Sequence, residues 1–170
     1  SRLLAQVVPR LPDTGLKAAA VARLALGRTS SDHGDQPQRL AQQAITLARE
    51  AHDPRAEVAA LAAWSDVCAG PDHVGERISA AERMLEVATG TGDVALVLLA
   101  RRLLVVALLE QGRFAEADVQ IAEFARAVLP LRLPLYSWLV PIWHGMRALM
   151  TGALDDVSTC VARATELADE

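Results

Sequence analysis

The sequence predicts an all-α protein in which antiparallel helix pairs repeat and stack on one another as a right-handed superhelix. Marker residues recur at an interval of 40 positions: Asp53 and Asp93 at one point of the pattern, Gly112 and Gly152 at another. A period between about 20 and 50 residues is typical of solenoids. Apolar residues follow three- and four-residue steps, without the sustained alternation of a strand. We therefore expect about four helix pairs, because short loops between helices produce antiparallel neighbours.

One helical-repeat domain is expected to span residues 1–170, with repeats at about 13–52, 53–92, 93–132 and 133–170. The chain begins at Ser1 without a methionine and ends at Glu170 within a helical pattern, and Leu3–Val8 resembles the last helix of a preceding repeat. We therefore expect a piece of a longer protein. Because one helix pair cannot bury its own apolar face, the ends are expected to expose apolar surface and to favour a homodimer.

The first helix of each repeat is predicted from long, mostly uncharged segments, as expected for helices with neighbours on two sides. These segments are residues 15–28, 54–69, 94–111 and 134–151. Asp53-Pro54 places a capping carboxylate before a proline at the first helical position. Glycines after helical segments suit left-handed C-terminal turns. These glycines are Gly70, Gly90, Gly112 and Gly152.

The second helix of each repeat is predicted from an apolar stripe with helical spacing, opposite a polar face. The segment that begins at Leu40 and ends at Ala51 has this character in the first repeat. The later stripes are Val74, Ile78, Ala81, Leu85 and Ala88; then Phe114, Ala117, Ile121, Phe124 and Val128; then Leu154, Val157, Val161, Ala164 and Ala168. Each stripe is expected to face the shared core.

Composition and charge narrow the classes of partner. The 170-residue chain is 52% hydrophobic with a net charge of −4, so a basic nucleic-acid-binding surface is not expected. The most apolar stretch, residues 94–109, is interrupted by Arg101-Arg102, whereas a membrane span needs about 20 apolar residues. Cys68 and Cys160 stand alone without metal-ligand spacing. We therefore expect a cytoplasmic protein that contacts neither a membrane nor nucleic acid directly.

One segment resembles a known repeat family. The nine residues from Leu109 to Ala117 place Gly112 at the turn, Phe114 two positions later and Ala117 three beyond it. This arrangement is similar to the middle of a tetratricopeptide repeat. Gly145 falls where that family has glycine for close helix contact. The period of 40 is longer than the usual repeat of about 34 residues, so the units are degenerate.

The combination of segments has a second resemblance. Leu47–Pro54, Gln111–Ala117 and Tyr136–Leu149 together look like a helical-repeat region of large actinobacterial ATP-binding LuxR-type activators and related signal-transduction ATPases. In those proteins a nucleotide-binding module precedes the repeats and a DNA-binding helix-turn-helix follows. The resemblance implies a sensor or protein-interaction role here, with catalysis and DNA contact in other modules.

No pattern of residues predicts an enzyme, a metal site or a cofactor. Gly90-Thr91-Gly92 lacks the further glycine and lysine of a phosphate-binding loop. Asp32, His33 and Asp35 could imitate a metal cluster, but a solvated turn explains them better in the polar loop 30–36. Ser137 has no partner arrangement that would make it a nucleophile. We therefore expect a protein without catalytic activity.

Aromatic residues concentrate in one predicted helix. Tyr136, Trp138 and Trp143 lie within residues 134–151, where Pro141 is expected to produce a kink because it removes a backbone hydrogen bond. One interpretation is a binding surface for an amphipathic helix, a peptide or a flat small molecule. The alternative is that these rings fill the core between the third and fourth repeats.

A concave groove is predicted from the exposed face of each first helix. Its residues share the 40-residue register and are Ala59, Ala62 and Asp66; Leu99, Arg102 and Val106; and Leu139, Ile142 and Met146. Arg102 either anchors an anionic group of a ligand or pairs with Asp66 to close the groove.

The predicted function is that of a regulatory interaction or sensor domain within a multidomain transcriptional regulator. Its groove would bind a partner protein, a neighbouring domain of its own chain or a small inducer. A small-molecule sensor built on the aromatic helix 134–151 and a plain oligomerisation scaffold are the alternatives.

Overall fold

The computed structural model describes residues 2–29, 34–131 and 134–168. Within these ranges the chain forms α-helices and short 3₁₀ helices without a strand, so the predicted all-α class is confirmed. No helix in the described ranges combines the length and apolar character needed to traverse a membrane. The chain divides into two compact units, Ser1–Phe114 and Ala115–Glu170, and the single domain of four stacked repeats stays a prediction.

Helix starts recur with the predicted interval. The helices that carry this recurrence are α4 (Pro54–Val67), α5 (Val74–Thr91), α6 (Val94–Glu110), α7 (Phe114–Val128), α8 (Pro134–Ser137) and α10 (Leu154–Ala168). First helices thus begin at positions 54, 94 and 134, and second helices at 74, 114 and 154, always 40 apart. Local sequence signals therefore placed these helices correctly.

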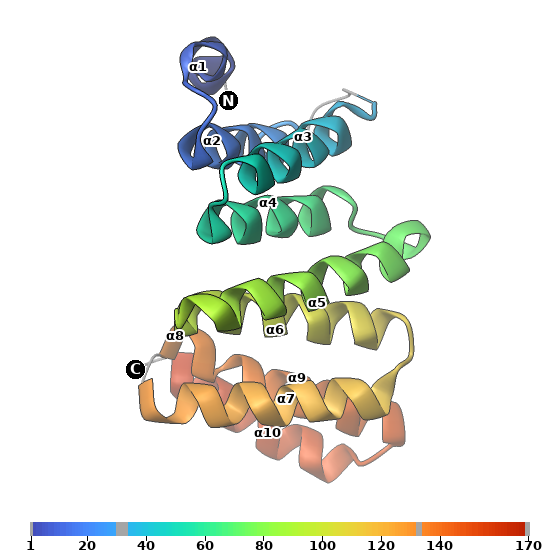
Figure 1. Ribbon diagram of the computed structural model, residues 1–170. Coiled ribbons are helices and arrows are strands. Elements are labelled where there is room, and N and C mark those ends of the chain that lie inside the picture. The colour runs from blue at the N-terminus through green and yellow to red at the C-terminus, as the bar shows by residue number, and fades with distance from the viewer. Residues whose placement is uncertain (1, 30–33, 132–133, 169–170) are drawn as a thin grey trace. The chain divides into compact units, whose positions relative to one another are not determined.

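The first unit is a layered set of helices (Figure 1). Besides α4, α5 and α6 it contains α1 (Arg2–Val7), η1 (Val8–Arg10), α2 (Gly15–Leu26), α3 (Gln36–Glu50) and η2 (Pro71–His73). From α2 onward each α-helix packs against the next in the chain, and the first helices α2, α4 and α6 also contact one another in that order. Alanine fills much of this core: Ala18, Ala48 and Ala56 form one buried cluster, in which small side chains let the helices approach closely.

Capping side chains fix where the first helices start. The Asp53 carboxylate accepts a hydrogen bond from Ala56 N at 3.0 Å, and Asp93 accepts from Ala95 N at 3.1 Å. Each bond satisfies a backbone N–H that a helix start leaves without an intrahelical partner. The predicted left-handed turn at Gly90 is wrong. Helix α5 continues to Thr91, and the left-handed residue is Gly92, with φ of 69°.

The second unit contains the rest of α7 together with η3 (Leu129–Leu131), α8, α9 (Leu139–Thr151) and α10. The predicted continuous helix 134–151 is interrupted at Trp138. Pro141 explains the position of the break: its ring clashes with the carbonyl four residues earlier, on Ser137, and it has no N–H to donate there. The distortion therefore lies one turn before the proline.

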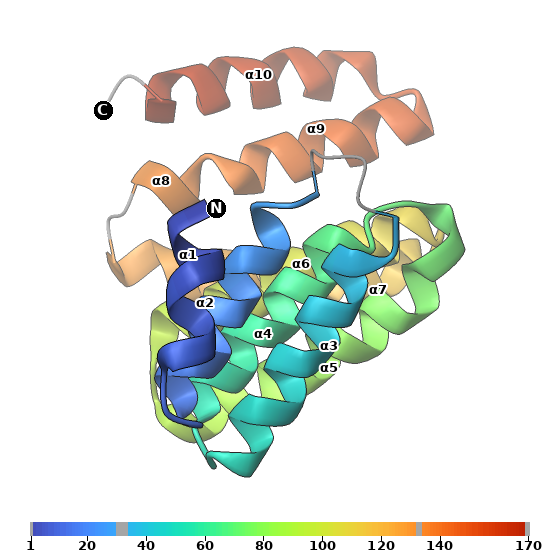
Figure 2. The same ribbon diagram turned by 90° about the horizontal axis from the view of Figure 1, so that it is seen from above.

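Helix α10 packs on α9, on the side of α9 remote from α7 (Figure 2). A β-carbon at Gly145 of α9 would lie 3.2 Å from Cys160 Cβ of α10, so the close contact that the resemblance implied at Gly145 is present. The predicted inward stripe of α10 is partly wrong, because Leu154 and Val161 are 65% and 59% exposed. The side chain of Ala168 lies outside the described part of the chain. Instead Leu167 is buried and Cys160 is half-buried, which rotates the packed face of α10 relative to the predicted one.

Candidate functional site

Six of the predicted groove residues lie on two adjacent helices of the first unit. On α4, Ala59 and Asp66 are exposed and Ala62 is half-buried, while on α6 the set Leu99, Arg102 and Val106 is half-buried. The opposite sides of these helices are buried in the core, and the helices pack against each other. Three of the predicted residues thus lie on α4 and three on the contacting helix α6, and we call this set the α4–α6 face.

Two charged groups dominate the α4–α6 face. Burial raises the pKa of the Asp66 carboxyl group, against the opposing attraction of Arg102 and Arg77. Asp66 as a whole residue remains exposed, so the desolvation concerns the carboxyl group rather than the entire side chain. Among the described ion pairs none joins Asp66 to Arg102, so these charges attract each other through space without closing the face. Asp66 is exposed as a residue, and Arg102 is half-buried.

A buried cation lies behind this face. Arg77, near the start of α5, is buried, and its guanidinium donates to the Glu110 carboxylate at the end of α6. Its Nε atom has no hydrogen-bond partner among the described residues. Sequence reasoning missed Arg77 because it lies within the apolar stripe of α5, beside Ile78. A charged residue at a stripe position was the available signal.

The aromatic residues of the second unit lie mostly in its core. Trp143 is buried, and its ring packs edge-on against Phe124 of α7, with centroids 5.0 Å apart. The ring of Tyr136 lies 6.4 Å from that of Phe124. The core alternative therefore describes Trp143. Tyr136, Trp138, Leu139 and Ile142 are half-buried, and Met146 is exposed.

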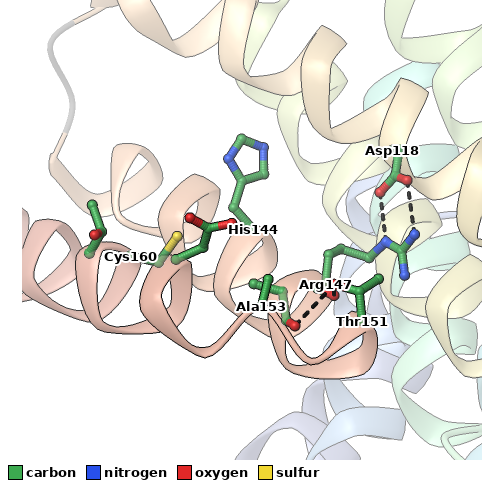
Figure 3. A pocket seen from close by; sticks show the side chains of 9 residues that line it. Asp118, His144, Arg147, Thr151, Ala153 and Cys160 are labelled. Carbon is green, nitrogen blue, oxygen red and sulfur yellow. Dashed lines mark hydrogen bonds and ion pairs between the residues drawn. The ribbon is translucent and has the colours of Figure 1, made fainter.

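A polar pocket of about 400 Å³ lies among α7, α9 and α10 (Figure 3). At its edge Arg147 donates to both carboxylate oxygens of Asp118, at 2.8 and 3.0 Å, and this contact lowers the pKa of Asp118. His144, Asp156 and Cys160 line the remainder. The sequence did not predict this pocket, because its residues come from three helices and share no local pattern.

A second hollow, of about 390 Å³, surrounds the side chain of Glu57 in the first unit. This buried carboxylate accepts hydrogen bonds from Arg49 of α3 at 3.0 Å and Arg83 of α5 at 3.1 Å. Burial alone would raise the pKa of Glu57, but the two guanidinium groups lower it overall. Glu57 therefore links three helices, and its charge is already matched by cations of the protein.

Metal-binding geometry is not found in the described part of the chain. No group of three or more His, Cys, Asp or Glu side chains comes together there. Asp32 and His33, which could imitate a metal cluster in the sequence, lie outside the described residues. Cys68 and Cys160 are free thiols, and burial raises the pKa of Cys68, which keeps that thiol unreactive.

Comparison of the chain with protein-family models gives no match, and comparison with curated proteins gives none either. The geometry alone therefore ranks the sites. In each hollow a carboxylate, Asp118 or Glu57, is already paired with arginine. The α4–α6 face combines open apolar surface with two charged groups that make no mutual ion pair, which makes it the candidate site.

Proposed function

We propose that the chain is a regulatory protein-interaction domain and that the α4–α6 face binds a helix or peptide of a partner protein or of a neighbouring domain. The observation that carries this proposal is the pair of rows on α4 and α6, in which Asp66 and Arg102 attract each other electrostatically and are not joined by a described ion pair. Such a row has the mixture of apolar and oriented polar groups that peptide-binding surfaces use.

The side chains of the α4–α6 face would contribute to binding in different ways. Ala59 and Ala62 are small, so a partner backbone can approach α4 closely. Leu99 and Val106 offer apolar area, and its burial contributes about 25 cal/mol per Å² before the costs of association. Arg102 supplies donors for a carboxylate of the partner, a contact that sets orientation more than affinity.

The same proposal includes the larger architecture. The recurrence of helix starts every 40 residues and the close contact at Gly145 support a tetratricopeptide-like right-handed superhelix of antiparallel pairs. In the LuxR-type regulators that the sequence resembles, catalysis and DNA contact lie in other modules of a cytoplasmic protein. Occupancy of the face would shift the population between two arrangements of those modules, provided the partner binds one arrangement more tightly.

A display selection of peptides against the whole chain tests the proposal. We expect selected peptides to carry an apolar row with an acidic residue, and Arg102→Glu to weaken their binding at least tenfold. An Arg39→Glu variant on the exposed side of α3 is the matched control and should bind them unchanged. If the selected peptides bind the Arg102→Glu and Leu99→Asp variants with the same affinity as the unaltered chain, the binding surface lies elsewhere.

A further inference from the structure

The outer side of α10 carries an apolar row that no described helix of the second unit covers. Leu154 and Val161 are both mostly exposed, although their positions correspond to the predicted core stripe of α7, 40 residues earlier. On α7 the corresponding Ile121 is 1% exposed, and Phe124 packs against Trp143 of α9. At Val161, therefore, α10 exposes an apolar side chain where the preceding second helix buries one, whereas the counterpart of Leu154 on α7, Phe114, is itself 36% exposed.

A second uncovered apolar surface lies at the start of the first unit. Leu3 and Val7 of α1 and Leu16 of α2 are exposed. Within this unit α1 lies on the side of α2 away from α4, so no further helix of the unit covers it (Figure 1). We call the surface formed by Leu3, Val7 and Leu16 the N-terminal face, and the row formed by Leu154 and Val161 the C-terminal face.

The two segments that bear these faces have opposite net charge. Residues 2–26 contain four basic side chains and one acidic side chain, Asp13, a net charge of +3. Helix α10 contains three acidic side chains and one basic side chain, a net charge of −2. Lys17 pairs with Asp13, and Arg163 pairs with Glu166. The basic groups beyond these pairs are Arg2, Arg10 and Arg23, and the acidic ones are Asp155 and Asp156.

We propose that the C-terminal face of one copy binds the N-terminal face of a second copy, head to tail. Apolar contact supplies the driving force, and the opposite charges orient the encounter. A symmetric contact between two α10 helices would instead bring two segments of net charge −2 together and raise the electrostatic cost. A head-to-tail contact leaves one face free on each terminal copy, so assembly continues beyond a dimer.

Sedimentation velocity of the full chain over a range of concentrations tests this contact. We expect species larger than a dimer at high concentration, and their dissociation as salt increases. Val161→Lys and Leu16→Glu each replace an exposed apolar residue on one face, and each variant alone should be monomeric. Val119→Lys on α7 is the matched control, because Val119 is 58% exposed, and it should assemble like the unaltered chain.

Mixing the two variants gives the sharper result. The intact N-terminal face of the Val161→Lys chain can bind the intact C-terminal face of the Leu16→Glu chain, so a one-to-one complex should form and grow no further. Dimers of Leu16→Glu alone would show a symmetric α10 contact and overturn the proposal. A monomeric unaltered chain at every concentration, or monomers only in the mixture, would also overturn it. Matching circular dichroism spectra establish that the variants are folded.

Discussion

Replacing Gly15 with alanine perturbs a close contact between the start of α2 and the start of α4. Gly15 is buried, and a β-carbon there would lie 1.9 Å from Asp53 Oδ2, 2.6 Å from its Cγ and 2.8 Å from its Cβ. The carboxylate can move by rotating about the side chain. The Asp53 Cβ cannot, because the backbone fixes it, so α2 must also shift away from α4.

The magnitude follows from these two displacements. Rotating the carboxylate breaks the cap bond to Ala56 N, and loss of an N-cap costs about 0.5–2 kcal/mol. Forcing one carbon into a packed contact costs about 1–3 kcal/mol. Alanine is favoured over glycine in a helix by about 0.5–1 kcal/mol, which offsets part of this. We therefore expect Gly15→Ala to lower the free energy of unfolding by about 1–4 kcal/mol.

Urea denaturation followed by far-ultraviolet circular dichroism measures this change. Gly75→Ala is the matched control, because Gly75 lies in the first turn of α5 and a β-carbon there would meet no neighbouring atom within 4 Å. That variant should be neutral or stabilised. Introducing Asp53→Gly removes the obstructing side chain and loses only about a few tenths of a kcal/mol of capping. Gly15→Ala should then cease to destabilise. Equal effects of Gly15→Ala with and without Asp53→Gly would refute the contact.

Three further substitutions test other parts of the structure. Glu57→Gln removes a carboxylate whose pKa is lowered by two guanidinium groups, and it should destabilise the chain by about 1–3 kcal/mol at neutral pH. Since that stability is lost as pH falls through the folded-state pKa, urea titrations should show the difference shrinking in acid. Asp66→Asn replaces a carboxyl group whose pKa is raised, so the variant should gain stability over the unaltered chain as pH rises through that pKa, measured in the same titrations. Trp143→Ala empties a buried site and should cost about 3–5 kcal/mol in urea unfolding, whereas Met146→Ala at an exposed site should have little effect.

The sequence predicted helix positions well because the responsible signals are local. Asp53 before Pro54 and Asp93 before Val94 are N-cap signals that predict helix starts independently of tertiary structure. Apolar stripes such as the one that contains Ile121 predict which side of a helix is buried. The sequence predicted a kink at Pro141, whereas the helix is interrupted at Trp138, about one turn earlier. The cause of this interruption is also local, since a proline acts on the carbonyl four residues before it.

The parts that the sequence did not predict depend on neighbours that are distant in the chain. In the sequence Glu57 is an ordinary acidic residue in the first turn of a helix. In the structure Arg49 of α3 and Arg83 of α5 both donate hydrogen bonds to it. Asp118 and Arg147 belong to exposed faces of different helices and meet only when α7 and α9 pack together. The packed side of α10 was predicted only in part: Val157 and Ala164 of its stripe are half-buried, whereas Leu154 and Val161 are exposed. Which of these residues are buried depends on which neighbour is present.

The α4–α6 face and the C-terminal face differ in a way that separates their roles. The rows of α4 and α6 lie at the same register of two first helices and mix small or branched apolar side chains with Asp66 and Arg102. Val161 of the C-terminal face lies on a second helix, at a position that is buried on α7 as Ile121. Exposure of an apolar side chain to water at such a position is unfavourable, and association with another surface that buries the side chain removes this cost. The first surface therefore fits the proposed reversible recognition of a partner, and the second fits the proposed contact with another copy.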